Sequence, residues 1–217
     1  MDRAITLFTS IFSNRSGVLA VGRDLSELKS EILRKSIHFL IALVPAIAAM
    51  NKAAAITLLL TGVLGYTLME YLRLAGIRVP VISSIVSMAS RPRDIGKFVM
   101  GPVTLGLGAL LALLLYPSSA AVIAIYALAF GDGLASLVGK FFGKIRPAFL
   151  LGKSVEGSLA CFAGVFASAF VVSGNLHIAF VAAFTAMVIE ALPLEDYDNL
   201  AIPMAVGLAV MVTSAVM

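Results

Sequence analysis

The sequence of 217 residues contains few charged residues, one cysteine and no tryptophan. Charged residues make up 13% of the chain, hydrophobic residues make up 60%, and the mean hydropathy is +1.04. Soluble globular domains carry about 25% charged residues, so this composition excludes a soluble enzyme or binding domain and indicates a membrane protein. The single cysteine, Cys161, excludes an intrachain disulfide and is expected to pack as a small apolar residue.

Seven apolar stretches are long enough, or nearly long enough, to cross a bilayer as helices, which requires about 20 residues. They are residues 37–50, 53–72, 98–116, 119–138, 157–173, 176–191 and 200–216. The expected fold is all-α: a polytopic membrane protein with about seven transmembrane helices, several of them short. Residues 31–217 are expected to form one catalytic transmembrane domain. Residues 1–30 are expected to form an interfacial segment with an amphipathic helix, and no removable signal peptide is expected.

Lysine and arginine residues are distributed asymmetrically between the connections of these helices. Fifteen of the sixteen lie on the side of the N-terminus, and only Lys52 lies on the other side. Because positively charged connections stay in the cytoplasm, the N-terminus is predicted inside and the C-terminus outside, in the cytoplasmic membrane if the cell is prokaryotic. Topology thus accounts for the high pI of about 9.4, and nucleic-acid binding is not expected.

The densest group of polar residues in the apolar part of the chain lies in residues 130–158, FGDGLASLVGKFFGKIRPAFLLGKSVEGS. An acid near the edge of the bilayer core is costly and therefore marks a functional site. If the fourth span continues as a helix, one narrow face of it carries Asp132, Ser136, Gly139, Lys140 and Gly143. Ser154 is predicted to cap the fifth span, whose free N–H groups beside Lys153 suit an anion.

The segment RKSIH at 34–38 opens the first span with two cations. Arg34 and Lys35 either bind phosphate oxygens or anchor the helix at the membrane surface, with Glu31 as a surface partner. His38 is expected to be a hydrogen-bonded structural histidine. At the end of the second span, the spacing of Glu70 and Arg73 predicts an ion pair.

A group of acids follows the sixth span, in the sequence EALPLEDYDN. Acids contribute little to topology, so Glu190, Glu195, Asp196 and Asp198 are free to bind a metal. The alternative is that Asp198 or Asn199 caps the last helix.

Cations from three connections and carboxylates from three helix ends are therefore expected on one side of the membrane. Phosphoryl transfer needs such a set, because cations and Mg²⁺ neutralise the transferring phosphate while a carboxylate orients or deprotonates the attacking hydroxyl. No cluster of cysteine and histidine favours zinc. The residues thus indicate a membrane enzyme that handles a nucleotide or pyrophosphate and a lipid.

Four segments, RKSIH at 34–38, FGDGLASLVGKFFGK at 130–144, GKSVEGS at 152–158 and EALPLEDYDN at 190–199, occur in an order that resembles the family of dolichol kinases, phytol kinases and CTP-dependent diacylglycerol kinases. The resemblance runs from about residue 30 onward. It implies an integral membrane kinase that transfers the γ-phosphate of CTP, with Mg²⁺ or another divalent cation, to a lipid alcohol on the cytosolic face. The acceptor alcohol would be a polyprenol, dolichol, phytol or diacylglycerol.

The resemblance also implies roles for individual residues. The catalytic residues would be Asp132, Glu156 and Asp198. The metal ligands would be Asp132, Glu156, Glu190 and Asp198. The nucleotide and its phosphates would be bound by Arg34, Lys35, Lys140, Lys144, Lys153, Ser154, Gly157 and Asn199, with His38 as the last candidate.

Two other functions are compatible with parts of the pattern, and a homo-oligomer is compatible with all of it. A phosphatidate cytidylyltransferase shares a similar segment of aspartate, glycine, lysine and glutamate. That family also carries lysine, arginine and histidine near its C-terminus, and residues 190–217 contain none of the three. A carrier or channel would favour charges at the middle of the bilayer, whereas the charges here gather at one face.

Overall fold

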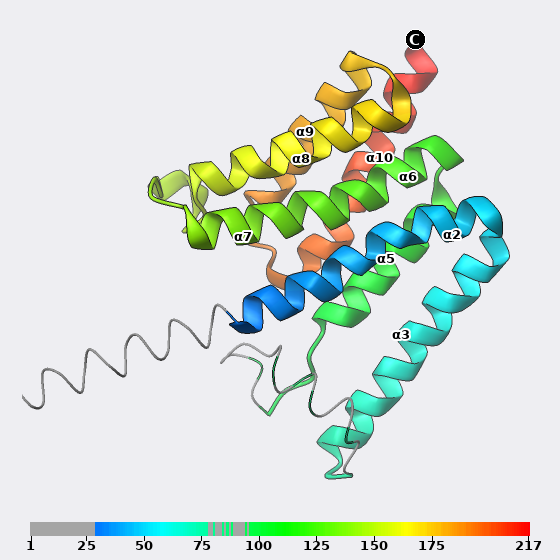
Figure 1. The fold of residues 1–217 in the computed structure, drawn as a ribbon, viewed down its shortest axis with the longest axis vertical. Helices are drawn as coiled ribbons and strands as arrows, with labels where there is room; N and C mark the ends of the chain where they lie inside the picture. Colours follow the sequence, from blue (N-terminus) through cyan, green and yellow to red (C-terminus); the bar gives the residue numbers. More distant parts are fainter. Residues whose placement is uncertain are drawn as a thin grey trace, which may run out of the picture.

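The computed structural model describes residues 29–77, 80, 84, 86, 88, 94 and 96–217, and the regular elements in these residues are helices (Figure 1). The all-α prediction is therefore confirmed for this part of the chain. The amphipathic helix predicted near the N-terminus falls almost wholly outside the described residues.

Five of the described helices are long and apolar enough to cross a membrane: Lys29–Met50, Lys52–Leu74 (α3), Ser118–Phe141, Val155–Ser173 (α8) and Glu195–Val216. Two shorter apolar helices are Gly101–Leu115 (α5) and Leu176–Glu190 (α9). Each has 15 residues and is therefore about 22 Å long, less than the roughly 30 Å of a bilayer core. The helices fit an integral membrane protein, while seven spans and the orientation remain predictions.

Three of the long helices contain more than one type of helical turn. The first comprises a helical start, a 3-10 segment Leu40–Leu43 (η1) and α2 (Val44–Met50). The fourth span comprises α6 (Ser118–Tyr126), a π-helical segment Ala127–Asp132 (η3) and α7 (Gly133–Phe141). The last comprises a 3-10 turn, Glu195–Tyr197 (η5), and α10 (Asp198–Val216). Another short 3-10 turn, Ala148–Leu150 (η4), lies in the connection between α7 and α8.

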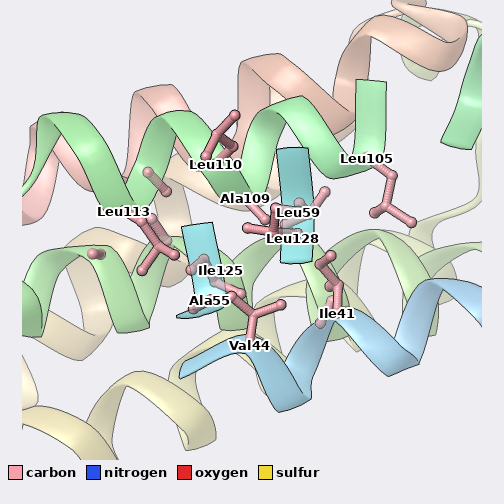
Figure 2. Packing of buried hydrophobic residues seen from close by; sticks show 14 residues of the cluster. Ile41, Val44, Ala55, Leu59, Leu105, Ala109, Leu110, Leu113, Ile125 and Leu128 are labelled. Atoms are coloured by element: carbon pink, nitrogen blue, oxygen red, sulfur yellow. The ribbon is translucent and has the colours of Figure 1, made fainter. Parts of the chain in front are cut away.

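The helix Ser118–Phe141 is the most buried of the five long helices. It packs against α8 and α10, and α5 lies between α10 and α3. Figure 2 shows the apolar side chains through which the first span, α3, α5 and the fourth span meet: Ile41, Val44, Ala55, Leu59, Leu105, Ala109, Leu110, Leu113, Ile125 and Leu128. A second cluster, rich in alanine, joins α8, α9 and α10 and contains Cys161. Cys161 is fully buried there, so its expected packing role is confirmed.

The ends of the helices that carry the polar segments lie at one end of the bundle. Figure 1 shows the start of the first span, the end of α7, the start of α8, the end of α9 and the start of α10 on the same side. The turn between α2 and α3, the turn between α8 and α9, and the C-terminus lie at the opposite end. Residues separated by more than 150 positions in the sequence are thereby brought to the same end of the molecule.

At the end of α3, the predicted ion pair between Glu70 and Arg73 is confirmed. The Arg73 Nε atom lies 2.7 Å from Oε2 of Glu70, whose side chain is fully buried. Glu70 Oε1 also accepts a hydrogen bond of 2.9 Å from the Val99 backbone N–H, and Arg73 donates to the Lys97 carbonyl. This pair therefore holds the segment that leads into α5 against the end of α3.

Candidate active site at one end of the helix bundle

Asp132 is the last residue of the π-helical segment η3, in the interior of the fourth span. The helix continues to Phe141, nine residues further on, so Asp132 lies about 13 Å inside the helix end and deeper than the sequence indicated. π-helical turns widen a helix locally and occur frequently at functional sites. An acid at this depth needs compensation from other polar groups.

A lysine and a histidine from the first span supply that compensation. The Lys35 ammonium group donates a hydrogen bond to Asp132 Oδ2, and the two residues are 4% and 6% exposed. His38 Nε2 lies 3.3 Å from the same oxygen and 2.8 Å from the Leu128 carbonyl. The hydrogen-bonded histidine is thus confirmed. Lys35 is a buried partner of Asp132 and not a surface anchor.

Glu31 forms a second polar link between the first span and α7. Its side chain is 1% exposed and pairs with Arg34 of its own helix. It also accepts hydrogen bonds of 2.5 Å from Ser136 and 2.6 Å from Lys140. The alternative that Glu31 is an ion-pair partner is confirmed for Arg34, but its expected place at the surface is wrong, because α7 covers its carboxylate.

The predicted polar face of α7 lines a cavity between α7, α8 and the start of α10, which we call the polar cavity. It includes Asp132, Ser136, Gly139 and Lys140 from the predicted face, together with Arg146, Gly152, Lys153, Ser154, Gly157, Ser158, Glu190, Glu195 and Asp198. The segments 130–144, 152–158 and 190–199 thus contribute to one cavity. Its lining carries three cations and four carboxylates.

The start of α8 is held at this cavity by Ser154 and Lys153. The Ser154 hydroxyl accepts a hydrogen bond of 3.1 Å from the Gly157 N–H, which confirms the predicted cap. Lys153 donates to the Glu190 carbonyl and lies 2.8 Å from Glu190 Oε1. Two separate bonds therefore tie the start of α8 to the end of α9.

Glycine at 157 is required by the close contact between α7 and α8. A Cβ atom at Gly157 would lie 2.8 Å from the Ala135 carbonyl oxygen and 3.2 Å from the Gly139 Cα. The two backbones can approach this closely only without a side chain there. Gly157 thus allows the polar face of α7 to meet the N-terminal turn of α8.

A second cavity, which we call the apolar cavity, adjoins the first span, α3 and α5. Its apolar lining includes Ile37, Val86, Val99, Pro102 and Leu105. Its polar lining includes Tyr66, Arg34, Lys35, His38, Asn199 and the acids Asp94, Asp132, Glu195, Asp196 and Asp198. The two cavities share Asp132, Glu195 and Asp198 in their linings. A polar and an apolar compartment therefore meet at the acids of η3 and α10.

Asn199 connects α10 to α5. Its side-chain amide donates to Thr104 Oγ1 at 3.0 Å and to the Gly101 carbonyl at 3.4 Å. The residue that precedes α10 is Tyr197, and no side chain caps this helix. The alternative that Asp198 or Asn199 caps the last helix is therefore wrong. Among the described residues, no cation forms an ion pair with Asp198.

Lys144 and Glu156 line neither cavity. The Glu156 carboxylate accepts hydrogen bonds from the backbone N–H groups of Lys144 at 3.0 Å and Ile145 at 3.2 Å. It thereby holds the connection between α7 and α8 against the start of α8. The structure gives Glu156 a local role, and the catalytic and metal-binding roles of this residue stay predictions.

Arg146 lines the polar cavity, although the sequence patterns did not single it out. Its guanidinium donates to the Gly152 carbonyl at 2.6 Å and to the Gly139 carbonyl at 2.8 Å. No spacing rule distinguishes Arg146 from Lys144 in a basic connection. The pairing of Glu31 with Arg34 follows from their helical spacing of three, whereas its burial under α7 does not.

Magnesium is the metal that the sequence predicts at this site. The described residues contain no group of three or more histidine, cysteine, aspartate or glutamate side chains placed to hold a metal. Asp132 and Asp198 are nevertheless shared by both cavities. Magnesium is commonly bound by one or two carboxylates together with water and substrate phosphates. The donor set therefore fits a metal bound with its phosphate ligand, not one enclosed by protein.

Comparison with known proteins identifies a distant relative. No protein-family model and no solved structure matches the chain. A probable chloroplastic phytol kinase of Triticum aestivum is 27% identical over 140 residues, which cover 56% of this chain and 47% of the relative. The chain thus spans about half the length of the curated relative that it matches. This similarity confirms the resemblance of the chain to the family of polyprenol and phytol kinases.

Proposed function

We propose that the chain is a lipid-alcohol kinase that transfers the γ-phosphate of a nucleotide to the hydroxyl group of a membrane lipid. The observation that carries this proposal is the meeting of a polar and an apolar cavity at Asp132 and Asp198. A lipid kinase needs one compartment for a phosphate chain, another for an aliphatic chain, and a shared wall where the two react. The similarity to a phytol kinase supports the same activity.

The polar cavity suits the phosphate chain. Lys140, Arg146 and Lys153 line it, and the N-terminal turn of α8 adds the partial positive charge of a helix start. Since Lys140 and Lys153 are held by Glu31 and Glu190, they are positioned before the nucleotide arrives. Donors fixed in advance stabilise transition-state charge without reorganisation.

Charge balance supports a requirement for Mg²⁺. Because four carboxylates line the polar cavity against three cations, a nucleotide triphosphate would add further negative charge to an acidic lining. Asp132 would help to hold a divalent cation bound with the phosphates, and that cation would neutralise this charge and supply electrostatic stabilisation.

Asp198 is the proposed base. Asp132 is already engaged by Lys35, whereas none of the cations in the described part of the chain pairs with Asp198. The alcohol oxygen bonds to the γ-phosphorus, the bond from that phosphorus to the β-γ bridging oxygen breaks, and the alcohol proton passes to the Asp198 carboxylate. The products are a lipid phosphate and a nucleoside diphosphate.

The apolar cavity suits the lipid end of the acceptor, an isoprenoid alcohol or diacylglycerol. The side chains of Ile37, Val99 and Leu105 cannot form hydrogen bonds. They therefore favour an apolar lipid chain without distinguishing one such chain from another. Two substrates that differ by one methylene group are distinguished by a hydrophobic pocket by only about 1–3 kcal/mol. We propose CTP as the donor from the resemblance alone, and the cytosol as the compartment from the charge asymmetry.

The experiment is a transfer assay on purified protein in detergent. Nucleoside triphosphates labelled at the γ-phosphate are supplied with Mg²⁺ and with phytol, a polyprenol or diacylglycerol. The expected product is a lipid that carries the γ-label with CTP and loses it when EDTA removes Mg²⁺. Lipid that retains label from the α-phosphate would identify a cytidylyltransferase instead. Ion flux in liposomes without nucleotide would identify a carrier.

A further inference from the structure

Two buried polar atoms that adjoin the polar cavity have no hydrogen-bond partner. Within the described residues these are Ser158 Oγ and Glu190 Oε2. The two residues are 7% and 6% exposed and both line the polar cavity. Buried polar atoms are paired in the great majority of cases, so an unpaired one at a cavity needs an explanation.

Two other serines of α8 form a side-chain hydrogen bond that the Ser158 hydroxyl lacks, so the helix itself does not prevent this bond. Ser168 donates to the Val165 carbonyl at 3.1 Å, and Ser173 donates to the Ala169 carbonyl at 2.7 Å. This bond to the preceding turn is the usual arrangement for a serine inside a helix. Ser158 instead keeps its hydroxyl available at the cavity wall.

The surroundings of Ser158 favour an anionic acceptor accompanied by a cation. Ser158 is the fourth residue of α8, within the turn where the helix dipole is positive, and Lys153 lines the same cavity. A hydroxyl there can donate to a phosphate oxygen. Glu190 Oε2 needs a hydrogen-bond donor or a cation instead, because a carboxylate oxygen can only accept. The other oxygen, Oε1, is already paired with Lys153. A phosphate group with a bound metal would supply a partner for each of these two atoms.

We propose that Ser158 is a further phosphate-binding residue of the polar cavity, whose hydroxyl donates to a phosphate oxygen of the bound nucleotide. This inference rests on the proposed function, because it takes the polar cavity to be the phosphate compartment. It gives a role to Ser158, the last residue of the segment GKSVEGS.

The test is Ser158→Ala, with Ser168→Ala on the same helix as the matched control. Binding of Mg²⁺ with inorganic tripolyphosphate is measured by isothermal titration, transfer kinetics by γ-label, and stability by thermal unfolding in detergent. We expect Ser158→Ala to weaken tripolyphosphate binding and lower kcat/KM for the nucleotide by roughly 10- to 100-fold, the effect of one hydrogen bond to a charged group. Its Tm should be unchanged or higher, because no internal hydrogen bond is lost. Ser168→Ala should bind and react as the wild type does.

Tripolyphosphate binding by Ser158→Ala equal to that of the wild type would overturn the inference and leave Ser158 as a hydrated hydroxyl. A lower Tm with unchanged binding would overturn it in favour of a structural role. If the wild type binds Mg²⁺ and tripolyphosphate but transfers phosphate from no nucleotide, the proposed function fails. The assignment of Ser158 would then still be decided by the binding data.

Discussion

The buried pair of Lys35 and Asp132 yields a prediction that separates stability from chemistry. Asp132→Asn leaves the Lys35 ammonium buried beside a neutral amide. Loss of one partner of a buried ion pair costs about 3–5 kcal/mol of the free energy of unfolding. For a chain of this length, each kcal/mol corresponds to about 2–4 °C in Tm, so we expect Tm to fall by roughly 6–20 °C.

The double variant Lys35→Met with Asp132→Asn removes both charges and should be more stable than either single variant, because apolar or neutral replacement of a whole buried pair is often neutral. Thermal unfolding of the four proteins in detergent gives the coupling between the two side chains. Kinase activity should fall at least ~100-fold in every variant that lacks Asp132, whatever its Tm. If the Tm change of the double variant equalled the sum of the two single changes, the side chains of Lys35 and Asp132 would not stabilise each other, and the buried ion pair would be refuted. Full activity in the double variant would remove Asp132 from the mechanism.

Three further predictions address other parts of the site. Glu31→Gln should lower Tm by several degrees and raise the KM for the nucleotide, since two cations lose their buried partner; the exposed Lys29→Gln serves as a control in both assays. Arg146→Gln should raise the nucleotide KM about tenfold with little change in the lipid KM, and an equal rise in both would contradict a phosphate contact. Ile37→Trp should fill part of the apolar cavity and raise the lipid KM alone, measured beside Ile32→Trp, which lies on an exposed part of the same helix.

Much of the local structure was predictable from patterns that act over a few residues. The spacing of polar residues along α7 identified the face that lines the polar cavity, because a helix repeats every 3.6 residues. Ser154 was identifiable as a cap because a serine before an apolar helix satisfies its first N–H groups. Glu70 and Arg73 were identifiable because a spacing of three places two side chains on the same side of a helix.

Contacts between distant segments were not predictable in the same way. Glu31 looked like a surface residue because nothing in its own helix reveals that α7 covers it. Asn199 looked like a cap, and it bonds instead to α5. Arg146 and Lys144 occupy equivalent places in a basic connection, and only the fold of that connection turns one of them toward the polar cavity.

The sequence by itself determined that the chain is helical and apolar, that its cations concentrate in particular connections between the apolar stretches, and that its motifs resemble those of lipid kinases, because composition and periodicity are local properties. Only the tertiary structure decided that Lys35 neutralises Asp132, that the Ser158 hydroxyl has no hydrogen-bond partner in the described part of the chain, and that the two cavities meet at Asp198. These facts depend on helices far apart in the chain. Burial makes an unpaired polar group costly, and burial is settled by how the helices pack together.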